Sequence, residues 1–169
     1  MSLFILSQIL IGIAICSDIT SFQLRKRSHI VSCLLVSCIF ISLHFMCLGH
    51  WTAAFLGIVA IARFSISIFS TSKIFLWIFI TTTVIVSIFT YDGLLSILGC
   101  TGSLFGTVAS FCKTDKLLRQ LMFIGTIFWI IHNSIAASPG AVIMEIIFIS
   151  SNVIGYYRYY IKSPKRVLS

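Results

Sequence analysis

Five ionisable residues lie inside long apolar stretches of the sequence, at Asp18, His44, Arg63, His132 and Glu145. Such side chains are costly inside a bilayer, and where membrane proteins keep them they mark solute pathways, proton relays or paired counter-charges. Histidine also changes its charge near neutral pH. These residue types could therefore bind a polar solute or pass a proton across a membrane.

Three of these residues are expected at one depth. His132 lies seven residues before Pro139 and Glu145 six after it, so at about 1.5 Å per helical residue both lie about 10 Å from the turn between them. His44 stands at the same distance from the turn before Trp51. The sequence therefore predicts a substrate- or proton-binding cluster, with the candidate residues His44, His132, Asn133, Glu145, Asn152 and Trp129. The alternative is a structural network, because polar side chains also hold membrane helices together.

Asp18 and Arg63 form a second candidate feature, nearer the other side of the membrane. An unpaired arginine in the middle of a bilayer costs at least about 2.5 kcal/mol. An ion pair between Asp18 and Arg63 would offset that cost and act as a gate on the inner side. The alternative is that Asp18 only caps the end of its helix, beside the basic residues 25–27.

The composition shows which elements must position these side chains. Of 169 residues 59% are hydrophobic and 9% charged, whereas about 25% of a soluble domain is charged. Because a transmembrane helix needs about 20 apolar residues, the apolar runs predict an all-α membrane protein with seven spans. This count leaves no room for a soluble catalytic domain, a Walker-type nucleotide site or a large ectodomain. The spans are expected near 3–24, 30–48, 52–72, 74–91, 94–112, 117–137 and 140–161.

The basic residues indicate the orientation of the chain. With seven spans, every one of the 12 lysines and arginines except Arg63 falls on one side of the membrane. Cytoplasmic loops collect lysine and arginine, so the N-terminus is expected outside and the C-terminus inside, in a multi-pass protein of a bacterial inner membrane. This asymmetry explains the net charge of +8 without a nucleic-acid partner.

The sequence also suggests an internal duplication. A shift of 88 positions places His44 on His132, with apolar matches around both. An odd number of spans between two units gives parallel repeats, of the kind that some transporters contain. We predict a first three-helix repeat at 1–72, a linker helix at 73–93, a second repeat at 94–161 and a basic cytoplasmic tail at 162–169. Chance matching in an apolar chain is the alternative.

Two further patterns concern packing and metals. Gly99, Gly102 and Gly106 share one span and include a Gly-x-x-x-Gly pair, which favours close approach of another helix. The six cysteines have no zinc-like spacing, so neither a metal site nor a cofactor is expected.

The chain resembles the YgjV family of bacterial inner-membrane proteins over nearly its whole length. The resemblance depends on the segments 129–133 and 138–141, on Glu145 and Asn152, and in the first half on His44, Gly49 and Arg63. That family is similar in architecture to the PQ-loop and SWEET group, which implies two parallel three-helix bundles and a linker helix. The chain departs from the PQ-loop pattern, since it has no Pro-Gln dipeptide.

These observations favour a small-solute transporter of SWEET-like architecture, not driven by ATP, for a sugar, an amino acid or an organic acid. The alternative is a membrane-embedded binding, sorting or accessory protein. An enzyme is not expected, because no nucleophile motif or metal-ligand spacing accompanies the ionisable residues. The expected partners are the lipid bilayer and a small solute, and a homo-oligomer is left open.

Overall fold

The structure is a computed structural model that describes residues 3–162, and within them every regular element is a helix, without strands. This confirms the predicted all-α membrane protein with seven helices. Most of the predicted basic tail, residues 163–169, lies outside the described residues. The helices are α1 (Leu3–Gln23), α2 (Arg27–Leu48), α3 (Trp51–Phe69), α4 (Lys73–Phe89), α5 (Gly93–Ser110), α6 (Asp115–Ile135) and α7 (Pro139–Tyr156), which continues into the π-helical turn η1 (Tyr157–Ile161).

Local chemistry explains where several helices begin and end. Gly49 ends α2 with a φ of 75°, a left-handed conformation that glycine adopts without strain. The hydroxyl groups of Ser72 and Thr114 accept hydrogen bonds from the first free amides of α4 and α6. Pro139 starts α7, where its missing N–H leaves no helical hydrogen bond unmade.

Five helices are long and apolar enough to cross a membrane, namely α1, α2, α3, α5 and α7 together with η1. The two remaining helices depart from this standard for different reasons. Helix α4 is apolar but has only 17 residues. Helix α6 has 21 residues, but it carries polar side chains along its length, and the buried ones include Arg119, His132 and Asn133.

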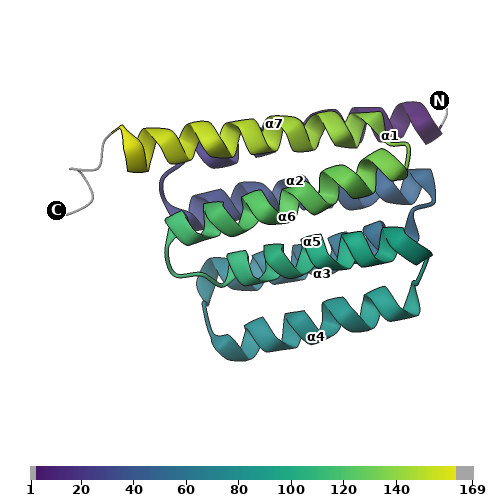
Figure 1. Cartoon of the computed structure of the whole chain (residues 1–169), viewed down its shortest axis with the longest axis horizontal. Helices are drawn as coiled ribbons and strands as arrows, with labels where there is room; N and C mark the ends of the chain where they lie inside the picture. Colours follow the sequence, from purple (N-terminus) through teal and green to yellow (C-terminus); the bar gives the residue numbers. More distant parts are fainter. Residues whose placement is uncertain (1–2, 163–169) are drawn as a thin grey trace.

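The helices form two rows (Figure 1). Helices α1, α2 and α3 lie side by side as the first row, and α5, α6 and α7 as the second row. The rows meet at both edges, where α1 contacts α7 and α3 contacts α5. Helix α4 lies outside this ring of six, against α3 and α5. Among the six helices of the ring, the same pairs stay in contact when the two rows are exchanged, which is compatible with the predicted three-plus-one-plus-three duplication. The duplication and its boundaries stay a prediction.

The loops alternate between the two ends of this ring. We call one end the basic end, because its loops at 24–26, 70–72 and 111–114 and the chain after α7 lie among most of the lysines and arginines. The other end holds the N-terminus of α1 and the loops at 49–50, 90–92 and 136–138, and these loops contain no lysine or arginine. We call it the vestibule end, for the pocket described below.

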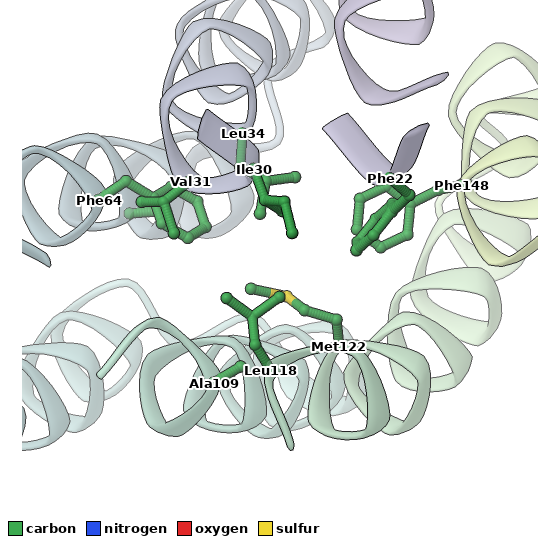
Figure 2. Close-up of a cluster of buried hydrophobic side chains, with 10 residues drawn as sticks. Phe22, Ile30, Val31, Leu34, Phe64, Ala109, Leu118, Met122 and Phe148 are labelled. Atoms are coloured by element: carbon green, nitrogen blue, oxygen red, sulfur yellow. The ribbon is translucent and has the colours of Figure 1, made fainter. Parts of the chain in front are cut away.

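Two apolar clusters fill the space between the rows. The cluster toward the basic end contains large side chains, and Phe22 and Phe148 pack edge to face there at 4.7 Å between ring centroids (Figure 2). The cluster toward the vestibule end is built largely on alanines, with Ala14, Ala53, Ala54 and Ala141 fully or almost fully buried. Larger side chains therefore close the basic end, while smaller ones line the approach from the vestibule end.

Candidate functional site

A cavity of about 110 Å³ lies at the centre of the ring. Residues from all six helices of the two rows line it, and α4 contributes none. The lining is mainly apolar but includes Asp18 from α1, Arg63 from α3 and Glu145 from α7. These three residues are 2%, 4% and 8% exposed, so each is held away from the lipid. The structure thus collects three of the five ionisable residues around one cavity.

The guanidinium group of Arg63 is fixed on one side only. Its Nη1 donates to the carbonyl oxygen of Ser103 at 3.0 Å and to the hydroxyl of Thr107 at 2.7 Å, both on α5. The Nε atom is buried and has no hydrogen-bond partner. A buried donor left unpaired costs about 1–3 kcal/mol, so Arg63 is held at some cost to stability. Gly106 makes room for the group, because a β-carbon there would lie 3.2 Å from Nη2 of Arg63.

The predicted ion pair between Asp18 and Arg63 is wrong. Both residues line the cavity, but within residues 3–162 the one salt bridge joins Arg119 to Asp115. The reason is the position of their helices: α1 lies at the edge of the ring next to α7, whereas α3 lies at the opposite edge next to α5. Asp18 and Glu145 therefore share one edge of the cavity, and Arg63 occupies the other.

The predicted cluster of His44, His132, Asn133 and Glu145 is not brought together as one site. His44 is fully buried, and its Nδ1 donates to the carbonyl oxygen of Ser7 at 2.9 Å. This leaves Nε2 of the neutral ring to accept the hydroxyl of Ser138 at 3.1 Å. Ser138 precedes α7, so His44 ties the first row to the second. Counting residues along helices estimated the depth of these side chains but not the direction each one faces.

His132 lies in a different environment. Its Nδ1 pairs at 3.0 Å with the side-chain oxygen of Asn133, the next residue in the chain. It also reaches a second pocket of about 300 Å³ at the vestibule end, which we call the vestibule. The vestibule is lined by residues 49–53, 90–92, Leu95 and His132, and the polar side chains among them include His50, Thr52 and Asp92.

Trp129 stands between the vestibule and the cavity. It lines the cavity, packs edge to face with His132 at 5.0 Å and stacks on Phe45 at 6.3 Å. Helices α5 and α6 approach each other closely beneath it, since a β-carbon on Gly102 would lie 2.8 Å from the Trp129 ring and 3.2 Å from the carbonyl oxygen of Gly125. Gly99 similarly faces Leu56 at 3.3 Å. Both glycines therefore lie at contacts that a side chain would disturb.

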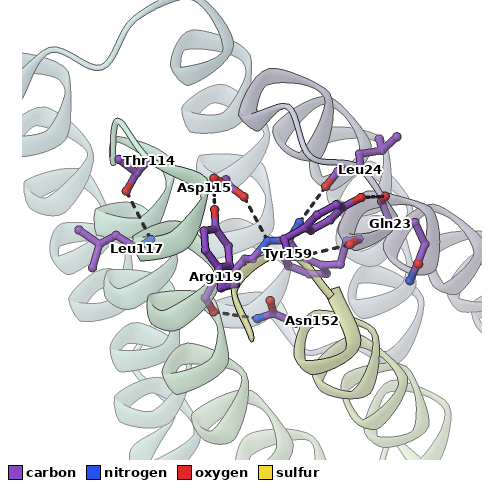
Figure 3. A network of polar contacts seen from close by, with 10 residues as sticks. Gln23, Leu24, Thr114, Asp115, Leu117, Arg119, Asn152 and Tyr159 are labelled. Atoms are coloured by element: carbon purple, nitrogen blue, oxygen red, sulfur yellow. Dashed lines mark hydrogen bonds and ion pairs between the residues drawn. The ribbon is translucent and has the colours of Figure 1, made fainter. Parts of the chain in front are cut away.

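Asn152 belongs to the basic end and not to the cavity. Its Nδ2 donates to the carbonyl oxygen of Arg119 at 2.8 Å, which joins α7 to α6 (Figure 3). Arg119 itself was expected among the exposed cytoplasmic cations, but it is only 1% exposed. An arginine shortly after a basic loop looks the same in the sequence whether it faces water or the helix interface. The spacing of Asp115 and Arg119 by one helical turn was the available signal for a pair.

Arg119 fastens the second row to the first. Its Nη1 and Nη2 donate to the carbonyl oxygens of Phe22 at 3.2 Å and Leu24 at 2.7 Å, at the end of α1. Its Nε lies 3.5 Å from the carboxylate of Asp115 (Figure 3). The guanidinium group also lies over the rings of Phe22 and Tyr159. We call this arrangement the Arg119 clasp.

A second clasp runs in the opposite direction. Arg27, at the start of α2, donates from Nε to the carbonyl oxygen of Cys112 at 2.8 Å and from Nη2 to that of Ser110. In each clasp, an arginine near the start of the middle helix of one row therefore holds the carbonyl end of the first helix of the other row. Carbonyl groups at a helix end carry partial negative charge and lack helical partners, so they suit a guanidinium group.

The arrangement places charged and polar groups around a small cavity between the two rows. Among residues 3–162, no group of three or more histidine, cysteine, aspartate or glutamate side chains is placed to hold a metal ion.

The comparison with known proteins agrees with this description of a membrane-embedded chain. The model of the family Imp-YgjV, described as bacterial inner membrane protein, matches residues 5–163. The chain is also similar to "Inner membrane protein YgjV" of Escherichia coli (strain K12), with 28% identity over 148 residues that cover 88% of this chain and 81% of the relative. No solved structure matches the chain. Since the family model covers almost the whole sequence, the chain belongs to the Imp-YgjV family of bacterial inner membrane proteins.

Proposed function

We propose that the protein carries a small solute across the inner membrane, without ATP, and that the central cavity is its substrate site. The observation that supports this most strongly is the central cavity itself, which residues of six helices line and which includes Asp18, Arg63 and Glu145. Groups of this kind inside a membrane are expensive, and a polar solute would supply the partners that they lack. The architecture that we propose is SWEET-like, with the two rows as the moving units.

The two ends suit alternating access to this site. Large apolar side chains and the two arginine clasps close the basic end. The vestibule extends inward as far as His132, whose ring contacts Trp129 in the cavity wall. Transport would then require the clasps to release and the contacts at the vestibule end to tighten.

We further propose that the basic end faces the cytoplasm, so that the vestibule opens outward. The absence of lysine and arginine from the vestibule-end loops within residues 3–162 supports this orientation. A fluorescent reporter that matures only in the cytoplasm, fused to the C-terminus, should be bright. A periplasmic phosphatase at the same position should be inactive, and the opposite pair of results would reverse the assignment.

Uptake by purified protein in liposomes tests the transport proposal. Radiolabelled sugars, amino acids, amines and organic acids would be screened with and without a proton gradient. The test variant is Glu145→Gln, which keeps the shape of the side chain but replaces its carboxyl group with an amide. We expect this variant to lose at least about nine-tenths of the uptake while remaining folded.

A failure of wild-type protein to move any member of the panel, with folding shown by a cooperative melt, would count against transport. It would favour the second candidate, a binding or accessory protein of the membrane. We assign no bond-breaking chemistry to the cavity residues.

A further inference from the structure

The charges of the central cavity are separated across it. Asp18 and Glu145 come from α1 and α7, the two helices that meet at one edge of the ring, and Arg63 comes from α3 at the opposite edge. The middle helices place apolar side chains between these edges, and they include Leu34, Phe45 and Met122. The cavity therefore offers a negative side, an apolar middle and a positive side.

The positive side presents a guanidinium group that is held in place from α5. Nη1 of Arg63 makes both of the hydrogen bonds that fix the group to α5, and Nε is buried without a partner. Arg63 lines the cavity, so the rest of the group brings its positive charge to the cavity wall. A guanidinium group suits a carboxylate in charge and in hydrogen-bonding geometry, and the two bonds to α5 hold it in position before a ligand arrives.

The negative side carries more charge than the cavity itself balances. Two carboxyl groups face one guanidinium group, and the carboxyl group of Glu145 makes no hydrogen bond with any residue in the range 3–162. Neither carboxyl group is paired with Arg63 within residues 3–162, so an ammonium group that entered the cavity would be the counter-charge available to them. A third group, the hydroxyl of Ser37, lines the same cavity and is also buried without a partner.

We propose that the cavity binds a small zwitterion, an amino acid with a short side chain, whose carboxylate meets Arg63 and whose ammonium group meets Glu145 and Asp18. Sugars would leave the charged groups without counter-charges, and a simple amine or carboxylic acid would satisfy one side only. The volume of about 110 Å³ is below the roughly 300–1,000 Å³ that is usual for ligand pockets, which favours a ligand with a short side chain. This inference rests on the proposed transport function, since it names the solute of the same site.

A ligand series on the wild-type protein tests the proposal directly. Binding of glycine and L-alanine to purified protein in detergent would be measured by calorimetry, beside ethylamine, propionate and glucose. We expect the two zwitterions to bind at least tenfold more tightly than each of the other three. Equal binding of ethylamine or propionate, preference for glucose, or no binding of either amino acid would overturn the proposal.

Two substitutions test which cavity residue binds the carboxylate of the ligand and which binds its ammonium group. Arg63→Gln should weaken alanine binding at least tenfold and leave ethylamine binding unchanged, whereas Glu145→Gln should weaken both. Arg158→Gln is the matched control, because Arg158 is exposed and lies outside the cavity. If Arg63→Gln does not fold, Arg63→Lys keeps the charge without the guanidinium group and should still weaken alanine binding.

The outcome for this inference can be separated from that for transport. Liposomes that take up a sugar or an organic acid, but neither glycine nor alanine, would contradict the zwitterion and leave the transport proposal standing. Tight alanine binding in detergent without any uptake would support the zwitterion site and contradict transport.

Discussion

At the basic end, arginines from both rows donate hydrogen bonds to the helix ends of the opposite row. At the vestibule end, the hydrogen bonds between the rows join neutral groups. Arg27 and Arg119 each make two hydrogen bonds across the interface between the rows. The contacts of the other end are His44 with Ser138 and Thr52 with Ser96, at 3.1 and 3.2 Å. Hydrogen bonds from charged groups stabilise a fold by about 1.5–3 kcal/mol and neutral ones by about 0.5–1.5 kcal/mol.

This difference suggests which end is easier to open. The basic end combines the stronger hydrogen bonds with the larger apolar side chains, and the vestibule end combines weaker bonds with alanines and an existing pocket. The two histidines that share a predicted depth differ in the same way, since His44 bridges the rows and His132 bonds only to its neighbour. Substitutions at the two ends should therefore have unequal effects on stability.

The largest effect is expected at the Arg119 clasp. Arg119→Ala removes the bonds from a charged group to Phe22 and Leu24, each of a kind that contributes about 1.5–3 kcal/mol, and it also removes the contact with the partly exposed Asp115. We expect the melting temperature in detergent to fall by on the order of 10 °C. Lys113→Ala, an exposed cation shortly before the same helix, is the control and should leave it unchanged. Equal melting of both variants would remove the distinction between the ends.

The second largest loss of stability is expected at Gly155, which leaves room for the Arg119 clasp. A β-carbon on Gly155 would lie 2.5 Å from the carbonyl oxygen of Phe22 and would meet Nη1 of Arg119. Gly155→Ala should therefore destabilise the protein by about 3 kcal/mol, the upper part of the usual range for overpacking. Gly12→Ala is the matched helical control, since a β-carbon there has no neighbour within 4 Å, and it should be neutral or slightly stabilising. A Gly155→Ala variant as stable as Gly12→Ala would contradict the geometry of the clasp.

The second clasp should be weaker than the first. Arg27 is only partly buried and has no acidic partner among residues 3–162, so Arg27→Ala should cost about 2 kcal/mol, the value of hydrogen bonds to a charged group. Lys26→Ala is the control, because Lys26 is the exposed neighbour of Arg27. Thermal melts of both variants in the same detergent would measure the difference, and a loss as large as that of Arg119→Ala would show that burial of the guanidinium does not decide the strength of a clasp.

The smallest effect on stability is expected for His132, at the vestibule end. His44→Ala should cost about 2 kcal/mol, because it removes two neutral hydrogen bonds and leaves the buried hydroxyl of Ser138 without that partner. His132→Ala should change the melting temperature less than His44→Ala and yet reduce uptake, since this ring separates the vestibule from Trp129. The reverse order of stability, or normal uptake by His132→Ala, would contradict the roles assigned to the two histidines.

The fold was largely accessible from the apolar pattern. The apolar runs are interrupted between Gln23 and Arg27, around Gly49 and at Pro139, by residues that end or start helices. The structure turns at the same places. The candidate site was accessible only in part. Asp18, Arg63, Glu145 and Trp129 were identified from their depth and type and do line the cavity, whereas Asn152 lies at the basic end. The contribution of Ser37 was missed, since a serine in a membrane helix usually bonds to its own backbone and gives no signal.

The sequence by itself determined that the helices are surrounded by lipid, how many helices there are and where the positive charge gathers. These properties depend on composition and on the length of apolar runs. Only the tertiary structure decided which polar side chains meet. Two residues at the same depth can face in any direction around their helices, and the direction is set by how six helices pack into a ring. That packing turned Arg119 inward to the end of α1, and it placed Asp18 and Arg63 across a cavity where an ion pair was predicted.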